Sequence, residues 1–201
     1  MDFNLKKAKI INFFSLLEKR EVVSQSNLAK NVIISLGMAN AILKKAISKG
    51  FVKAKTAPYK RYIYYLTKKG FIEKSRLVRE YLDSSLDFFK SAKLDYLKIL
   101  NAIKKKKLEV ILVGEGDLAD ICKLALLEEN LIISGHLKFN KNKKLNYEFK
   151  NKKKPPEQLA FVIVESKNPQ FVHDELIKSY NVINIYYPKF LHISKNVSEY
   201  L

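Results

Sequence analysis

Residues 24–55 read SQSNLAKNVIISLGMANAILKKAISKGFVKAK, and this stretch decides the fold of the first part of the chain. A serine precedes each of two helical patterns, at positions 24 and 35, where its hydroxyl can cap the first turn. The second pattern runs to about Lys49, and Gly50 supplies its stop. Helical spacing predicts that these side chains face inward: Leu36, Ala39, Leu43, Ala46 and Ile47.

The sequence on either side of this stretch completes a winged helix-turn-helix pattern. Upstream, residues 5–19 place apolar side chains close to one helical face. Downstream, FVKAK (51–55) and RYIYYLT (61–67) are typical of strands, and TAPYK (56–60) places Pro58 at the turn between them. The order helix, helix, turn, helix, hairpin predicts an α+β winged-helix domain over residues 1–70.

This region resembles the MarR-type winged-helix regulators, especially the short group associated with exopolysaccharide loci. The resemblance covers roughly residues 5–80 and implies a transcriptional regulator that binds double-stranded DNA. The matching positions are Ser24, Gln25, Leu28, Ala29, Ser35, Leu36, Gly37, Asn40, Leu43, Lys44, Lys49, Gly50, Leu66, Thr67 and Gly70.

The outward face of the helix that follows Ser35 and the tip of the hairpin are the expected DNA contacts. The first residues of such a helix approach base edges, so Met38, Asn40 and Ala41 are candidates for base readout, while lysines further along meet phosphates. Asparagine can read adenine or simply bond to nearby backbone. The hairpin lysines fit a wing on DNA, or merely a solvated ribbon. The predicted DNA-binding residues are Ser35, Gly37, Met38, Asn40, Ala41, Lys44, Lys45 and Ser48 on the helix, with Lys53, Lys55, Tyr59, Lys60 and Arg61 on the hairpin.

The net positive charge lies almost entirely in the first half of the chain. The net charge is +18, and residues 1–107 hold 25 Lys and Arg against 8 Asp and Glu, a net +17. A genome rich in A·T pairs also favours lysine, but such a bias would not stop at one half. Localised basicity indicates a polyanionic partner, because lysines that neutralise phosphates release condensed counterions.

Helical spacing resumes from Gly70 to about Lys106. The apolar residues fall on two heptad positions, Phe71, Val78, Ala92 and Ile99 on one and Leu82, Phe89, Tyr96 and Ile103 on the other. We expect residues 71–107 to connect two domains and to form a homodimer, which would read two half-sites. Packing against the second domain could bury the same residues.

Residues 108–201 alternate strand and helix patterns and predict a small Rossmann-like α/β domain. The polar stretch from about 139 to 158, which ends in Pro155 and Pro156, is expected to be a mobile surface excursion. The run VGEGDLA follows a predicted strand and opens a predicted helix, which is the context of a dinucleotide-binding turn. It supplies the candidate ligand-binding residues Gly114, Gly116, Asp117 and Ala119.

Dinucleotide binding is nevertheless disfavoured. The next strand ends in His136 to Phe139 without the acid that binds a ribose hydroxyl, and Asp117 would repel a phosphate at the helix start. Residues 108–188 resemble the Rossmann-like halves of sugar acetyltransferases and of some winged-helix regulators. In those relatives the second strand typically ends in acidic residues, so Lys138 puts a nucleotide-related activity in doubt. We therefore expect the domain of residues 108–201 to serve in effector sensing or in oligomerisation.

Other classes of function are weighed against this hypothesis. One alternative is a nucleotide-sugar-related enzyme or ligand-binding protein with an accessory basic domain, and another is an RNA-binding or structural adaptor. No catalytic or metal-ligand spacing surrounds the single cysteine, Cys122, or the three scattered histidines. We therefore expect no enzyme activity, no cofactor and no metal. The lack of a signal peptide and of a long apolar run predicts a cytoplasmic protein.

Overall fold

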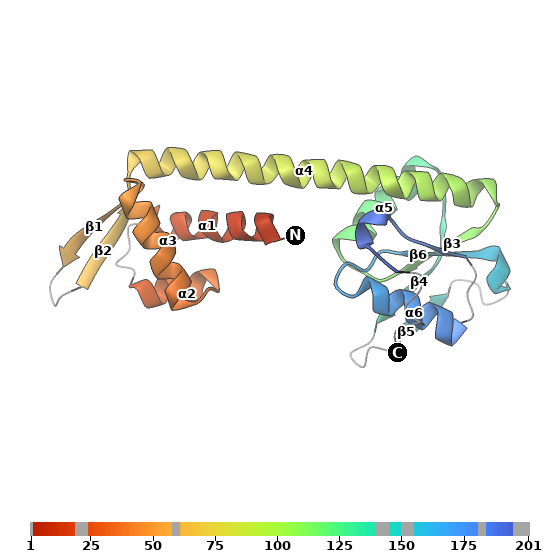
Figure 1. The fold of residues 1–201 in the computed structure, drawn as a ribbon. Helices are drawn as coiled ribbons and strands as arrows, with labels where there is room; N and C mark the ends of the chain where they lie inside the picture. The colour runs from red at the N-terminus through yellow and green to blue at the C-terminus, as the bar shows by residue number, and fades with distance from the viewer. Residues whose placement is uncertain are drawn as a thin grey trace. The chain divides into compact units, whose positions relative to one another are not determined.

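The computed structural model describes residues 2–18, 24–57, 61–139, 145–149, 155–180 and 184–194. The chain divides into two compact units, Met1–Asp87 and Phe88–Leu201. Figure 1 shows the elements of each unit in chain order. Within the described ranges, no helix is both long and apolar enough to cross a membrane.

The first unit has the predicted winged-helix order of three helices followed by a hairpin. Its elements are α1 (Asp2–Glu18), α2 (Gln25–Val32), α3 (Leu36–Ser48), β1 (Val52–Ala57), β2 (Arg61–Leu66) and the first part of α4 (Lys68–Lys105). Strands β1 and β2 pair antiparallel, with Val52 opposite Leu66. Both predicted serine caps are confirmed: Ser24 Oγ accepts from the Asn27 N–H and Ser35 Oγ from the Met38 N–H, each at 3.2 Å.

One apolar core joins the helices of this unit to the hairpin. It is formed by Phe13, Phe14, Leu17, Leu28, Ala29, Val32, Ala39, Leu43, Ala46, Val52, Tyr64 and Leu77. The predicted inward stripe of α3 is confirmed at its three central members. It is wrong at both ends, because Leu36 and Ile47 are 51% and 40% exposed. Leu36 begins the helix, and Ile47 lies about 70° round the helix from the centre of the stripe.

The turn between α2 and α3 holds a β-branched residue in a left-handed conformation. Ile33 has φ 56° and ψ 58° and its side chain is 83% exposed. This conformation costs an L-residue about 1–2 kcal/mol, whereas glycine adopts it freely and loses about 0.5–1 kcal/mol of chain entropy. Ile33→Gly should therefore raise the free energy of unfolding by about 0.5–1 kcal/mol.

Urea unfolding of Ile33→Gly and of a matched control checks this expectation. Ile132 is exposed to the same 83%, and it is not among the residues with positive φ. Ile132→Gly should destabilise its unit, because glycine raises the conformational entropy of the unfolded chain and no backbone strain is relieved at this position. If both variants shift the urea midpoint downward, Ile33 is not strained.

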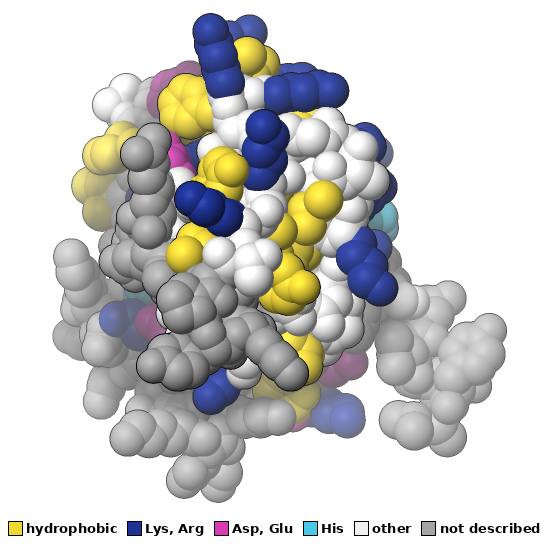
Figure 2. All heavy atoms as spheres, turned by 90° about the vertical axis from the view of Figure 1, so that its left-hand side faces the viewer, with side chains coloured by type: hydrophobic (Ala, Val, Ile, Leu, Met, Phe, Trp, Pro, Cys, Tyr) yellow, Lys and Arg dark blue, Asp and Glu magenta, His cyan; other side chains and the backbone are white. Residues whose placement is uncertain are grey.

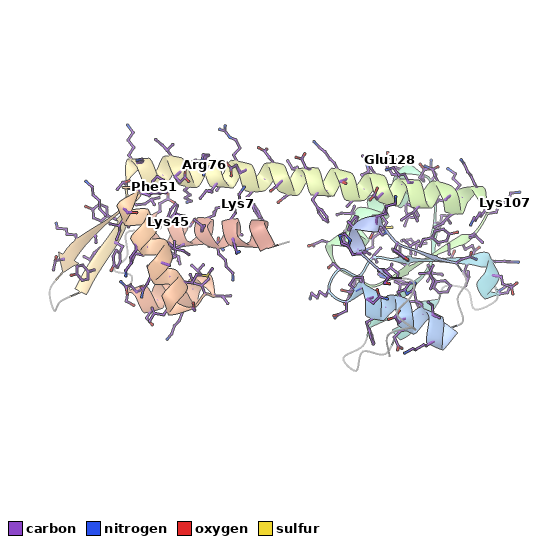
Figure 3. All side chains as sticks on the ribbon, viewed as in Figure 1. Lys7, Lys45, Phe51, Arg76, Lys107 and Glu128 are labelled. Atoms are coloured by element: carbon purple, nitrogen blue, oxygen red, sulfur yellow. The ribbon has the colours of Figure 1, made fainter. Side chains whose placement is uncertain are left out.

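Helix α4 belongs to both units. Its first part packs on α1: Leu77 is buried there, and Lys7 of α1, labelled in Figure 3, pairs with Glu80 at 2.8 Å. Its last part lies in the core of the second unit, where Ala92, Tyr96 and Ile103 are fully buried. The connector predicted over residues 71–107 is thus a continuous helix whose residues contribute to two cores.

The second unit is a five-stranded sheet with helices on both faces. Its further elements are β3 (Glu109–Val113), α5 (Asp117–Glu128), β4 (Ile133–Phe139), β5 (Leu145–Phe149), η1 (Pro156–Gln158), β6 (Leu159–Ile163), α6 (Pro169–Tyr180), β7 (Ile185–Tyr186) and η2 (Lys189–Leu191). The strand order is β5-β4-β3-β6-β7, and every neighbouring pair is parallel except β4 with β5. Val110 and Leu112 face the cluster with α4 and α5, while Ile111 and Val113 face the cluster with α6. The expected parallel α/β arrangement is present.

Strand β5 corrects one expectation. The sequence predicts a mobile surface excursion from about 139 to 158, yet residues Leu145–Phe149 within it form a strand that pairs with β4, with Phe149 opposite Gly135. The run LNYEF alternates apolar and polar residues, which is itself typical of a strand. The lysine- and asparagine-rich residues on either side, 140–144 and 150–154, outweighed this short alternating pattern.

Candidate nucleic-acid interface

The outward face of α3 carries the residues predicted to meet DNA. Gly37, Ala41 and Ser48 follow its midline, and the side chains of Lys44 and Lys45 are also exposed. Figure 3 labels Lys45 on this helix. Met38, at the border of the face, is 40% exposed. Ser35 is the N-cap, so its hydroxyl is engaged by the helix itself.

The lysines of this face and of the wing have no acidic partners among the residues that the structure describes. No described acidic side chain forms an ion pair with Lys44, Lys45, Lys53 or Lys55. Figure 2 views the molecule from the side that lies left in Figure 1, and hydrophobic side chains there are interspersed with those of lysine and arginine. Such a surface can neutralise phosphates and also make apolar contacts.

The hairpin forms the predicted wing, and its two faces differ. Lys53 lies opposite Tyr65 and Lys55 opposite Ile63, so these lysines share one face of the ribbon. Tyr62 and Tyr64 lie on the other face and stack with ring centroids 6.3 Å apart. Of the remaining predicted wing contacts, Tyr59 and Lys60 lie outside the described residues, and only the backbone of Arg61 is described.

A hollow of about 750 Å³ lies between the wing, the start of α3 and the start of α2. It is lined by Ser24, Gln25, Ser26, Asn27, Leu36, Tyr62 and Tyr64. Gln25 Nε2 donates to the Tyr64 hydroxyl at 2.9 Å, which fixes α2 to the wing. All seven lining side chains are uncharged, but most carry hydroxyl or amide groups that can bind a polar partner.

Asn40 is less accessible than the sequence suggested. Its side chain is half-buried, and its Oδ1 atom is buried without a hydrogen-bond partner among the described residues. Bidentate readout of adenine uses both the oxygen and the nitrogen of the amide. This placement is unfavourable for such a contact.

Several residues of this surface were missed by the sequence. Leu36 was assigned to the core, and Gln25 and Tyr62 were not assigned to the interface. The signals were present but weak: Leu36 directly follows a cap, where the helix does not yet cover its side chain, and Tyr62 alternates with the buried Tyr64. The hollow depends on contacts between distant segments, which periodicity does not reveal.

In the second unit, the glycine turn is tightly packed at one end and open at the other. Gly114 has φ +108°, and a Cβ there would lie 2.7 Å from the Glu165 backbone nitrogen. Gly116 has φ +101° with open space around it and is the N-cap of α5. Asp117 is exposed, whereas Ala119 is buried in the core and cannot reach a ligand. Only Gly116 and Asp117 of the four candidates face solvent.

The two glycines give a matched pair of stability predictions. Gly116→Ala should cost about 1–3 kcal/mol from backbone strain alone. Gly114→Ala should cost about 1–3 kcal/mol more, because its Cβ also collides with the backbone of Glu165. Urea unfolding of both variants measures the difference. Equal losses would show that close packing at Gly114 is unimportant.

The cysteine and two of the histidines of the second unit are buried or half-buried. Burial raises the pKa of the Cys122 thiol to about 12, so that it is protonated and unreactive near neutral pH. His136 Nε2 lies 2.6 Å from the Gly114 carbonyl oxygen. His173 is buried against Asp174, with Nδ1 and Oδ1 3.1 Å apart. The first contact joins β4 to the turn after β3, and the second lies within α6.

Comparisons with known proteins show only weak similarities. No protein-family model and no curated protein matches the chain. Among solved structures, FabT of Streptococcus pneumoniae in complex with DNA is 22% identical with a TM-score of 0.31, over 39% of this chain and 56% of FabT. The transcriptional regulator PA4135 is 23% identical with a TM-score of 0.32, over 50% of this chain and 76% of that one.

A third solved structure, PigF with SAH, is 11% identical with a TM-score of 0.26, over 92% of this chain and 56% of PigF. This chain therefore spans little more than half the length of FabT and of PigF. TM-scores of this size do not establish a shared fold.

Proposed function

We propose that this protein is a sequence-specific transcriptional regulator that binds duplex DNA through α3 and the wing. The observation that carries the proposal is the outward face of α3. This face is accessible, it bears Lys44 and Lys45 without acidic partners among the described residues, and it belongs to a helix-turn-helix with an adjoining basic hairpin. In such a motif the second helix enters the major groove. The proposal includes no catalytic activity and no cofactor, and it places the protein in the cytoplasm.

The hollow beside α3 supports this mode of binding. When α3 lies in a major groove and the wing reaches the adjacent minor groove, one sugar-phosphate strand must pass between them. The hollow lies between α3 and the wing, and it offers hydroxyl and amide groups from Ser24 to Asn27. Phosphate oxygens accept hydrogen bonds from such groups. The hollow thus has the position and the chemistry that this strand requires.

Dimerisation through the first part of α4 belongs to the same proposal. Of the predicted heptad residues, Phe71 and Leu82 are about half exposed, and Leu86 extends their stripe with 54% exposure. The stripe lies nearly opposite Leu77, which packs towards α1. The later heptad residues, from Phe89 to Ile103, pack into the core of the second unit instead. A second copy of the chain covering this stripe would place two copies of α3 on two half-sites.

For the α/β unit we propose effector sensing or oligomerisation. The open end of the glycine turn, at Gly116, lies at the carboxyl end of the central strand β3. In parallel sheets this edge, between strands that diverge in order, is where ligands bind.

A charge introduced on α3 tests the proposed function. Ala41→Glu places a carboxylate at the middle of the outward face, where DNA phosphates would repel it, and we expect a loss of duplex affinity of about 100-fold or more. Glutamate is a good helix former, so α3 should persist. Fluorescence anisotropy with a duplex pool measures the affinity.

The matched control is Ala102→Glu, the same change at an exposed position of α4 in the second unit. It should leave duplex affinity within about twofold, because both variants lower the net charge equally and only the location differs. Equal affinity of wild type and Ala41→Glu would rule out α3 as the DNA-binding element.

A further inference from the structure

The first turns of α3 present an apolar surface to the outside. From Leu36 to Ala41 the exposed side chains are those of Leu36, Met38 and Ala41, and Gly37 has none. Leu36 and Met38 are 51% and 40% exposed. The one polar side chain between Leu36 and Ala41 is that of Asn40, which is half-buried and whose Oδ1 atom is enclosed. The first exposed polar side chain after it is that of Lys44, one turn further on.

These residues occupy the part of the helix that approaches base edges in a helix-turn-helix. Guanine, cytosine and adenine are distinguished in the major groove by hydrogen-bond donors and acceptors, whereas thymine also offers its C5 methyl group. An apolar side chain cannot satisfy the polar edges, and covering them without a partner is costly. It can, however, pack on a methyl group.

We infer that Leu36, Met38 and Ala41 read thymine methyl groups, so that each half-site of the operator carries thymines beneath the start of α3. This inference rests on the proposed function and specifies what the recognition helix selects. Small residues at 37 and 41 let the helix approach closely, and Met38 lies at one border of this face. Leu36 reaches DNA from the exposed start of the helix, beside the hollow. Lys44 and Lys45 hold the backbone without adding a preference at these positions.

Deoxyuridine substitution tests the inference with the full chain and a duplex recovered by selection. Deoxyuridine pairs like thymidine but lacks the C5 methyl group. Replacing single thymines should weaken binding about three- to tenfold at two or three positions of each half-site, the effect of one buried methyl group. At those positions cytosine should weaken binding too, and 5-methylcytosine should recover part of the loss.

Two variants separate methyl readout from general loss of affinity. Met38→Ala should abolish the deoxyuridine effect at one position, whereas Lys53→Ala on the wing should weaken the thymine and deoxyuridine duplexes equally. Duplex binding that is insensitive to deoxyuridine at every position would overturn the inference and leave the proposed function intact. Absence of any duplex binding would overturn the proposed function and the inference together.

Discussion

Raising the salt concentration from about 50 to 200 mM should weaken duplex binding by about 10³- to 10⁵-fold, because on the order of 6 to 10 phosphates are neutralised by lysines. The exposed lysines of α3 and of the wing have no acidic partners among the described residues, so they are available for this role. A titration series by fluorescence anisotropy gives the slope of log affinity against log salt, which should lie between about −5 and −9.

Single lysine variants assign this slope to the interface. Lys44→Ala should make it shallower by about one, the contribution of one phosphate contact. Lys98→Ala, at an exposed position of α4 outside the interface, should leave the slope unchanged. A wild-type slope shallower than about −2 would mean that DNA is bound by few phosphate contacts and that the basic first half has another purpose.

Charge placed on the α4 stripe should separate the dimer. The double variant Leu82→Glu, Leu86→Glu would bury two carboxylates per subunit in the proposed interface, and we expect dimerisation to weaken by at least about 100-fold. Binding to a two-half-site duplex should fall with it, because the two copies of α3 would no longer be linked. Sedimentation across a range of protein concentrations measures the change.

The control uses the same substitution on another side of the same helix. Leu94 is 56% exposed but lies well away from the stripe round the helix. Leu94→Glu should sediment like the wild type. A wild-type chain that remains monomeric at tens of micromolar, both free and on DNA, would show that the stripe is not a dimer interface.

Local signals in the sequence predicted most of the fold correctly. The caps at Ser24 and Ser35 form because a hydroxyl needs only the next turn of the chain as its partner. The two strands of the hairpin and the buried strands of the sheet likewise follow from patterns within a few residues. The central stripe of α3 is buried as its spacing indicated.

The errors arose where distant segments decide the outcome. Leu36 has the residue type of a core position, yet at the start of α3 its side chain is 51% exposed. Strand β5 is a five-residue run among lysine- and asparagine-rich residues, and its pairing with β4 is what makes it a strand. The apolar heptad residues of α4 lie on one continuous helix, but those of its second half pack into the core of the α/β unit. For the candidate interface, the lysines of α3 could be placed from the sequence, whereas the hollow lined by Gln25 and Tyr62 required the structure.

The central claim, that the outward face of α3 selects a DNA sequence, is tested most directly by sequencing duplexes that the full chain retains from a random pool at about 50 mM salt. We predict one enriched motif with thymine-containing half-sites about one DNA turn apart, and no such enrichment with the Ala41→Glu variant. A wild-type chain that retains no duplex, or that enriches the same motif as Ala41→Glu, would contradict the claim.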